Sequence, residues 1–145
     1  CVQFGSWQLR RFRGHAHVVP VLPPIDPALC LAWQGEASLF WPPLQAQLTF
    51  TPRTGEGISL SRLQSAPVSL RLRRGGETLR PHPRAAHRTL KHLLQEKQVP
   101  PWQRERLPLI YCGEKLVAVA GVAIAAEFQA EAGEVGLLPL IRDRA

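Results

Sequence analysis

The chain has 145 residues, enough for one ordinary domain whose core needs no disulfide or metal to hold it together. Hydrophobic residues make up 45% and charged residues 20%, which excludes a disordered chain, and the 14 prolines favour short strands and turns over a helical bundle. Lysine and arginine total 18 against 11 acidic residues, and the resulting net charge of +7 favours an anionic partner over a cationic one.

The first half of the chain predicts short strands. Residues 7–13 and 16–22 indicate two strands joined by a turn at Gly14, and we interpret this hairpin as the tail of a preceding module. The proline-rich stretch 21–27 is typical of a connector. Four short alternating runs follow, which cover residues 29–33, 37–40, 45–51 and 58–60.

The second half is more regular. Residues 68–74 alternate apolar and polar side chains, which predicts a half-buried strand, and Gly75-Gly76 then lets the chain turn. Residues 89–98 form the best helix, with Thr89 as its N-cap. Pro100-Pro101 ends that helix and begins a short helical turn through Arg106. Further strands are expected at residues 109–112 and 115–120 and within 135–141. Together these elements predict an α+β fold with a mainly antiparallel, β-rich domain and one principal helix.

The opening residues and the cysteines bear on the origin of the chain. Met is absent and the chain begins with Cys1, so we expect a fragment of a longer protein. The opening residues lack the apolar core of a signal peptide, and the longest apolar run, residues 116–126, is shorter than the about 20 residues that a membrane helix needs. Cys1, Cys30 and Cys112 are far apart, which is typical of buried thiols in a reducing compartment. We expect a cytoplasmic protein that does not bind a membrane.

The positive charge is concentrated in one quarter of the chain. Residues 71–106 hold ten lysines and arginines and only three glutamates, whereas the rest of the chain is balanced. We therefore divide the chain into a tail of a preceding domain (1–24), a β-rich connector with the start of the next domain (25–66), and a basic domain (67–145).

The basic segment is the strongest functional signal. On the predicted helix, Arg88, Lys91, His92 and Gln95 lie opposite Leu90, Leu93 and Leu94, and the preceding loop adds Arg80, Arg84 and His87. Such a surface binds polyanions through counterion release, and arginine can grip a phosphate with two hydrogen bonds. The alternative is a solvated basic face on a structural or protein-interaction module. The candidate nucleic-acid contacts are Arg73, Arg74, Arg80, Arg84, Arg88, Lys91, Arg104 and Arg106.

Catalytic and metal signals are weak. Of the five histidines only His15 and His17 have the spacing of metal ligands, and no third ligand accompanies them. A GxSxG motif and a phosphate-binding glycine motif are both absent, and the glycine pairs are interpreted as turns. We assign no catalytic and no metal residue. A free-standing enzyme that uses His15 and His17, or His87 and His92, remains a second alternative.

Residues 68–124 carry a family resemblance. The run LRLRRGGETLRP, an arginine-rich loop and TLKHLLQEKQVPPWQRERLPLIYCGEKLVAVAGVAI together resemble the C-terminal domain of bacterial tRNA(Ile)-lysidine synthetases. Residues 1–65 match the family more loosely. The resemblance implies that residues 1–24 are the tail of its middle substrate-binding domain, that 25–66 lead into its C-terminal domain, and that 67–145 are the basic C-terminal domain. His92 stands where the family often has a second lysine, so we expect one phosphate contact to be weaker there at neutral pH. The residues that stand in the family's positions are Gly75, Gly76, Glu77, Leu79, Arg80, Pro81, Leu90, Lys91, Pro100, Pro101, Trp102, Arg104, Arg106, Pro108 and Leu109.

The resemblance implies a part of an ATP-dependent ligase that converts the anticodon wobble cytidine of tRNA(Ile) to lysidine. ATP and Mg would bind in an N-terminal catalytic domain marked by SGGxDS, a motif that this sequence lacks, so we expect no cofactor here and no catalysis by this chain alone. The implied partners are the acceptor stem of tRNA(Ile) and the enzyme's own N-terminal domain, with a homodimer left open. The implied fold is shared with the B3/B4 region of the phenylalanyl-tRNA synthetase β chain.

Overall fold

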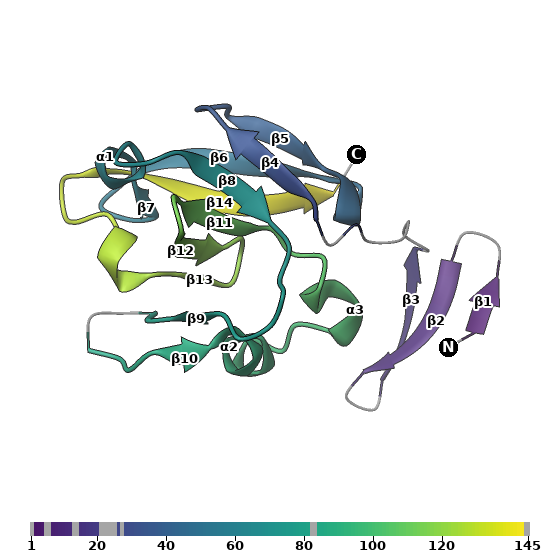
Figure 1. The fold of residues 1–145 in the computed structure, drawn as a ribbon. Helices are drawn as coiled ribbons and strands as arrows, with labels where there is room; N and C mark the ends of the chain where they lie inside the picture. The colour runs from purple at the N-terminus through teal and green to yellow at the C-terminus, as the bar shows by residue number, and fades with distance from the viewer. Residues whose placement is uncertain are drawn as a thin grey trace.

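Strands dominate the molecule (Figure 1). The computed structural model describes residues 2–4, 7–12, 15–20, 26, 28–81 and 84–143, with side chains within residues 26–141 of those ranges. The described strands form four sheets in which every paired strand is antiparallel. The predicted α+β class is therefore confirmed. No helix in the described part is long and apolar enough to cross a membrane.

The amino-terminal sheet contains the predicted hairpin. Strand β2 (Trp7–Phe12) pairs with β3 (His15–Pro20) along its whole length, and the unpredicted β1 (Val2–Phe4) pairs with the other edge of β2. The predicted turn residue Gly14 and most of the connector 21–27 lie outside the described residues, as do the side chains of His15 and His17.

A five-stranded sheet joins both halves of the chain. Its order is β13 (Ala123–Ile124), β12 (Lys115–Val119), β11 (Leu109–Cys112), β8 (Val68–Arg71) and β4 (Cys30–Trp33). Strand β8 is shorter than the predicted 68–74, because its pairing with both neighbouring strands ends at Arg71. In β11, Leu109 and Ile110 point to opposite faces and both are buried, so this strand is covered on both sides.

A four-stranded sheet lies against one side of the first (Figure 1). Its order is β5 (Ser38–Trp41), β6 (Ala46–Thr54), β14 (Val135–Asp143) and β7 (Ile58–Ser59). A short 3₁₀ helix, η1 (Pro42–Leu44), connects β5 to β6, and a second, η2 (Ala126–Phe128), precedes β14. Strands β6 and β14 pair over all nine residues of each. The predicted strand 58–60 ends at Ser59, because Leu60 begins the short helix α1 (Leu60–Leu63).

The basic segment covers the other face of the five-stranded sheet. Strands β9 (Thr78–Leu79) and β10 (Arg88–Thr89) pair with each other and lead into α2 (Leu90–Glu96), which is followed by α3 (Pro101–Arg104). Figure 1 shows β9, β10 and α2 below the five-stranded sheet, on the side away from β6 and β14. Their buried leucines belong to the same core cluster as those of the sheets.

Pro139 sits inside β14, where the missing N–H of a proline would normally break a ladder. Strand β7 pairs only with Gly136 and Leu137 on this side of β14. The carbonyl oxygen of Pro139 accepts a hydrogen bond of 3.3 Å from the Gly121 N–H, which comes from the same open side. The proline therefore points its donor-free nitrogen away from β6 and leaves the long β6–β14 ladder intact.

A carboxylate holds α1 against the loop before β14. Glu134 accepts hydrogen bonds from the hydroxyl groups of Ser59 (2.8 Å) and Ser61 (3.0 Å) and from the backbone N–H of Glu131 (2.9 Å). These bonds stabilise the charged form, the backbone bond most, and they lower the pKa of Glu134 below its ordinary 4.5. Ser59 is also the N-cap of α1.

This pKa shift predicts an acid-sensitive contribution to stability. Because the pKa is lower in the folded chain, the contribution is fully present above pH 4.5 and is lost as the pH falls through the folded value. Glu134→Gln should lower the urea midpoint at pH 7, and the gap between wild type and variant should be narrower at pH 3. A gap that is equal at both pH values would contradict the assignment.

Candidate nucleic-acid interface

Helix α2 builds the centre of the predicted interface. The Thr89 hydroxyl accepts a hydrogen bond of 3.2 Å from the His92 N–H, so the predicted N-cap is confirmed. Leu90, Leu93 and Leu94 are buried. Lys91, His92 and Gln95 are exposed, as the helical period predicts.

Arg88 differs from its predicted place on the helix. It lies in β10, opposite Leu79 of β9, and so precedes the N-cap. Its guanidinium reaches along α2 and bonds the carboxylate of Glu96, which also lies 3.1 Å from Nε2 of His92. One carboxylate oxygen thus meets two basic side chains, and a phosphate that binds Arg88 must displace or share Glu96.

The other predicted residues are spread along the same segment. Arg73 and Arg74 follow β8, Arg80 follows β9, Arg84 lies in the loop before β10, and Arg104 and Arg106 lie at and after the end of α3. The exposed ones are Arg74, Arg84 and Lys91, and the half-buried ones are Arg73, Arg80, Arg88, Arg104 and Arg106.

The guanidinium of Arg80 has a buried donor. Its Nε atom has no hydrogen-bond partner in the part of the chain that the structure describes. The backbone at this point is fixed, because the Arg80 carbonyl accepts a bond of 2.7 Å from the Ala126 N–H and the Pro81 carbonyl accepts one of 2.6 Å from the Gln129 side chain. A buried donor without an acceptor is rare in proteins, and an anion is a natural partner for one on arginine.

Arg104 and Arg106 also hold the fold together. Nε of Arg104 donates to the Val99 carbonyl at 2.7 Å, which ties α3 to the end of α2. Nη1 of Arg106 donates to the Pro43 carbonyl at 2.8 Å, and the Arg106 carbonyl accepts a bond of 2.6 Å from the Trp41 indole. Both side chains therefore have a structural role beside any contact with a ligand.

Arg71, which was not among the predicted contacts, is engaged by the five-stranded sheet. Its guanidinium stacks on the Tyr111 ring, 4.6 Å from the ring centroid, and contacts Ser69 and Glu114. Burial of Tyr111, together with the charge of Glu77, raises the pKa of this phenol above 10.0. Glu77 itself lies between β8, which carries Arg71, and β9.

Comparisons with known proteins agree with this architecture. The model of the family described as "TilS substrate C-terminal domain" matches residues 68–140, which include all eight predicted contact residues. The chain belongs to this family. Among curated relatives, the tRNA(Ile)-lysidine synthases of Nitrosomonas europaea and Coxiella burnetii are 38% and 36% identical to it over 90% and 92% of its length. The chain spans 29% of the length of each of these two relatives.

A solved structure supports the fold. The structure described as "Crystal structure of TILS C-terminal domain" superposes with a TM-score of 0.64 at 16% identity and covers 81% of this chain and 98% of the other. This match shows the fold, and the family model and the curated relatives confirm the family resemblance of residues 68–124. The chain is thus a member of the TilS C-terminal domain family, and the curated relatives that it matches are tRNA(Ile)-lysidine synthases.

The glycine turn of this TilS domain is occupied by one of its own side chains. The Gly75-Gly76 pair, predicted as a turn, is closed by the carboxylate of Glu77. Among the described side chains, no three histidines, cysteines or acids come together as metal ligands. His87 and His92 are both exposed. We assign no step with ATP or Mg to these residues.

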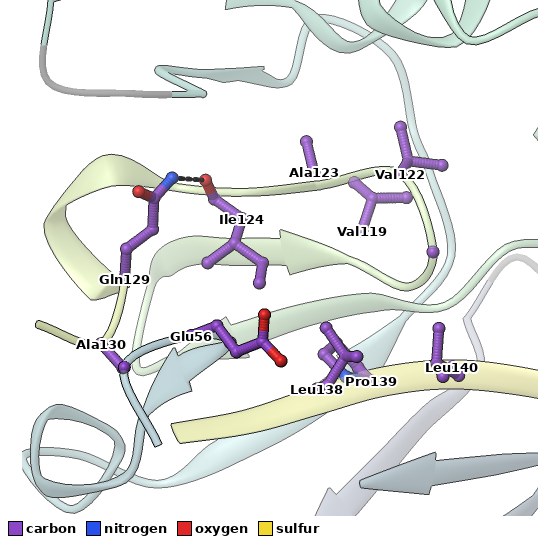
Figure 2. A pocket seen from close by; sticks show the side chains of 13 residues that line it. Glu56, Val119, Val122, Ala123, Ile124, Gln129, Ala130, Leu138, Pro139 and Leu140 are labelled. Carbon is purple, nitrogen blue, oxygen red and sulfur yellow. Dashed lines mark hydrogen bonds between the residues drawn. The ribbon is translucent and has the colours of Figure 1, made fainter. Parts of the chain in front are cut away.

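A pocket of about 420 Å³ has no lysine or arginine in its lining (Figure 2). Its walls are the turn 55–57, the chain from Val119 to Ile124, and residues 138–140 of β14. Figure 2 shows the polar side chains of Glu56 and Gln129 beside the apolar ones. Glu56 pairs with Arg53 at 3.8 Å, and the amide of Gln129 bonds the carbonyls of Pro81 and Ile124. The lining is otherwise mostly apolar, so this pocket offers no acid–base pair for catalysis.

Two acidic residues of the interface were not predicted as functional. The sequence places Glu77 in a glycine turn and in the family pattern, and Glu96 in the helix, without a contact role for either. The spacing of four residues between His92 and Glu96 is a signal that sequence alone offers, because such residues are neighbours on a helix. No comparable sequence signal links Glu96 to Arg88 across the N-cap.

Proposed function

We propose that this chain is the tRNA-docking, non-catalytic C-terminal part of a tRNA(Ile)-lysidine synthase, and that its β9–β10–α2 layer receives the acceptor stem of tRNA(Ile). One observation carries the proposal: within the segment that holds the excess positive charge, β9, β10 and α2 pack against the five-stranded sheet, and Arg74, Arg84 and Lys91 of this segment are exposed. Arg73, Arg80, Arg88, Arg104 and Arg106 complete the proposed contact set.

Phosphate and ribose contacts should dominate the interaction. The deep groove of A-form RNA hides its base edges, so a basic layer meets the backbone and the shallow minor groove first. In the whole enzyme, docking here would hold the tRNA while a separate domain, with ATP and Mg, modifies the anticodon wobble cytidine. The chain would then work in the cytoplasm, with the enzyme's own catalytic domain as its second partner.

The decisive experiment is a titration of the chain into labelled tRNA(Ile) and an unrelated tRNA at several salt concentrations. A steep salt dependence with preference for tRNA(Ile) supports docking with specificity. A steep dependence without preference supports a phosphate-binding module whose parent enzyme reads the tRNA elsewhere. Absence of binding at low salt would overturn the proposal in favour of a protein-interaction module with a solvated basic face.

Single-residue variants test the layer itself. Lys91→Ala should weaken binding to all tRNAs and reduce the slope of log K against log salt by about one. Arg88→Ala should weaken binding more than Lys91→Ala, because it also leaves the Glu96 carboxylate without its arginine partner. The affinity at three salt concentrations is the measurement. An unchanged slope in both variants would remove α2 from the interface.

A further inference from the structure

A glutamate closes the turn that carries Arg73 and Arg74 from β8 toward β9. The Arg74 N–H donates to Oε2 of Glu77 at 2.7 Å, and the Gly75 N–H donates to Oε1 at 2.9 Å. Both oxygens of one carboxylate are thus held by successive backbone donors. Hydrogen bonds from backbone N–H groups to a charged acceptor are about twice as strong as those between neutral groups.

The two glycines make this arrangement possible. Gly75 has φ +106° and Gly76 has φ +80°, values that residues with a side chain rarely adopt. A Cβ on either glycine would meet no other atom within 4 Å, so the glycines are required for their backbone conformation and not for space. The turn forms a concave set of N–H groups of the kind that binds anions, and the chain fills it with its own side chain.

Glu77 also holds the first residue of α2. Its carbonyl accepts a hydrogen bond of 2.8 Å from the N–H of Leu90, the first residue of α2. The next two residues, Thr78 and Leu79, pair with Thr89 and Arg88. One residue thus connects the turn that carries Arg73 and Arg74 to the start of the helix that carries Lys91.

We propose that Glu77 is a positioning residue for RNA binding, because its carboxylate fixes the backbone from which Arg73 and Arg74 extend relative to Lys91 on α2. This inference rests on the proposed function. On this inference, a negatively charged residue strengthens the binding of a polyanion. Charge alone predicts the opposite sign, since removal of an acid from a basic surface should strengthen RNA binding.

The test compares two charge-matched variants by titration with transcribed tRNA(Ile). Glu77→Gln keeps the size of the side chain and loses the second acceptor oxygen. We expect about three- to tenfold weaker binding, because RNA must then order a loose turn. Glu105→Gln, with the same change of charge at an exposed residue of the segment 71–106, should bind RNA as tightly as wild type or more tightly. Glu77→Asp, which retains the carboxylate, should recover most of the lost affinity.

Amide hydrogen exchange measures the order of the turn in the absence of RNA. In wild type, the amides of Arg74 and Gly75 should exchange with solvent more slowly than the amide of exposed Gly35, and Glu77→Gln should abolish that protection. If Glu77→Gln does not fold, the wild-type exchange rates and the Glu77→Asp titration still test whether the Glu77 carboxylate holds the turn and supports RNA binding.

The outcomes separate the inference from the proposed function. If wild type binds tRNA and Glu77→Gln binds as tightly as Glu105→Gln, Glu77 does not position the arginines. Fast exchange of both amides in wild type would show that the Glu77 carboxylate does not hold the turn. If wild type fails to bind tRNA at low salt, the proposed function fails first, and the role of Glu77 in RNA binding fails with it.

Discussion

Gly136→Ala is expected to destabilise the fold by about 3 kcal/mol or more, because a side chain at this position has no space. A Cβ there would lie 2.0 Å from the carbonyl oxygen of Glu56 and 2.8 Å from the Cβ of Ala130. The first of these atoms is backbone, in the turn between β6 and β7, which crosses over β14 at this point. The clash can be relieved only if the turn or the strand moves, and Gly136 pairs with strands on both sides.

The measurement is urea unfolding followed by tryptophan fluorescence. Gly35→Ala is the matched control, because Gly35 has φ +98° and a Cβ there would meet open space, so this variant tests backbone strain without a clash. That control should cost about 1 kcal/mol. If Gly136→Ala costs no more than Gly35→Ala, the turn over β14 is looser than the structure indicates.

Trp41→Ala should have an effect of similar size, about 3–5 kcal/mol. The indole is fully buried, and its N–H donates to the Arg106 carbonyl at 2.6 Å, 65 residues along the chain. The Arg106 side chain in turn donates a hydrogen bond to the Pro43 carbonyl. Two hydrogen bonds therefore join the end of β5 and the residues after it to the segment after α3. Trp41→Phe retains most of the apolar surface and should cost less, about 1–3 kcal/mol, chiefly through the unpaired carbonyl.

Trp33→Phe provides the comparison. Its indole also donates to a carbonyl, that of Glu36 at 2.8 Å, but the partner is local and the side chain is only half-buried. We expect Trp33→Phe to cost less than Trp41→Phe. A double-mutant cycle of Trp41→Phe with Arg106→Ala should be non-additive, since both variants break the same junction. Additive effects would show that the two bonds act independently.

The sequence was sufficient to predict those strands and helices whose pattern lies in neighbouring residues. Alternation predicted the buried Val68 and Leu70 of β8, and a cap followed by leucines at helical spacing predicted α2. Partners could not be predicted in this way, because a period of two residues says which face a side chain takes and not which strand lies beside it. The pairing of β4 with β8, and of β6 with β14, depends on segments that lie far apart in the chain.

The candidate interface was likewise predictable in its composition and not in its contacts. The excess of positive charge in residues 71–106 was evident from composition, and the family match covers that span. The partners of individual charges were not evident. Arg88 meets Glu96 only because β10 places it beside α2, and Glu77 closes its turn only because two glycines adopt positive φ. Such contacts follow from backbone geometry, which residue type alone does not specify.

The long ladder between β6 and β14 constrains when this domain can fold during synthesis. Residues 46–54 leave the ribosome about ninety positions before their partners at 135–143. Until then, one edge of β6 lacks the neighbour that will cover its backbone groups for nine residues, and an open strand edge is a site for pairing with other chains. One edge of β6 is therefore open to pairing with other chains until β14 has been synthesised.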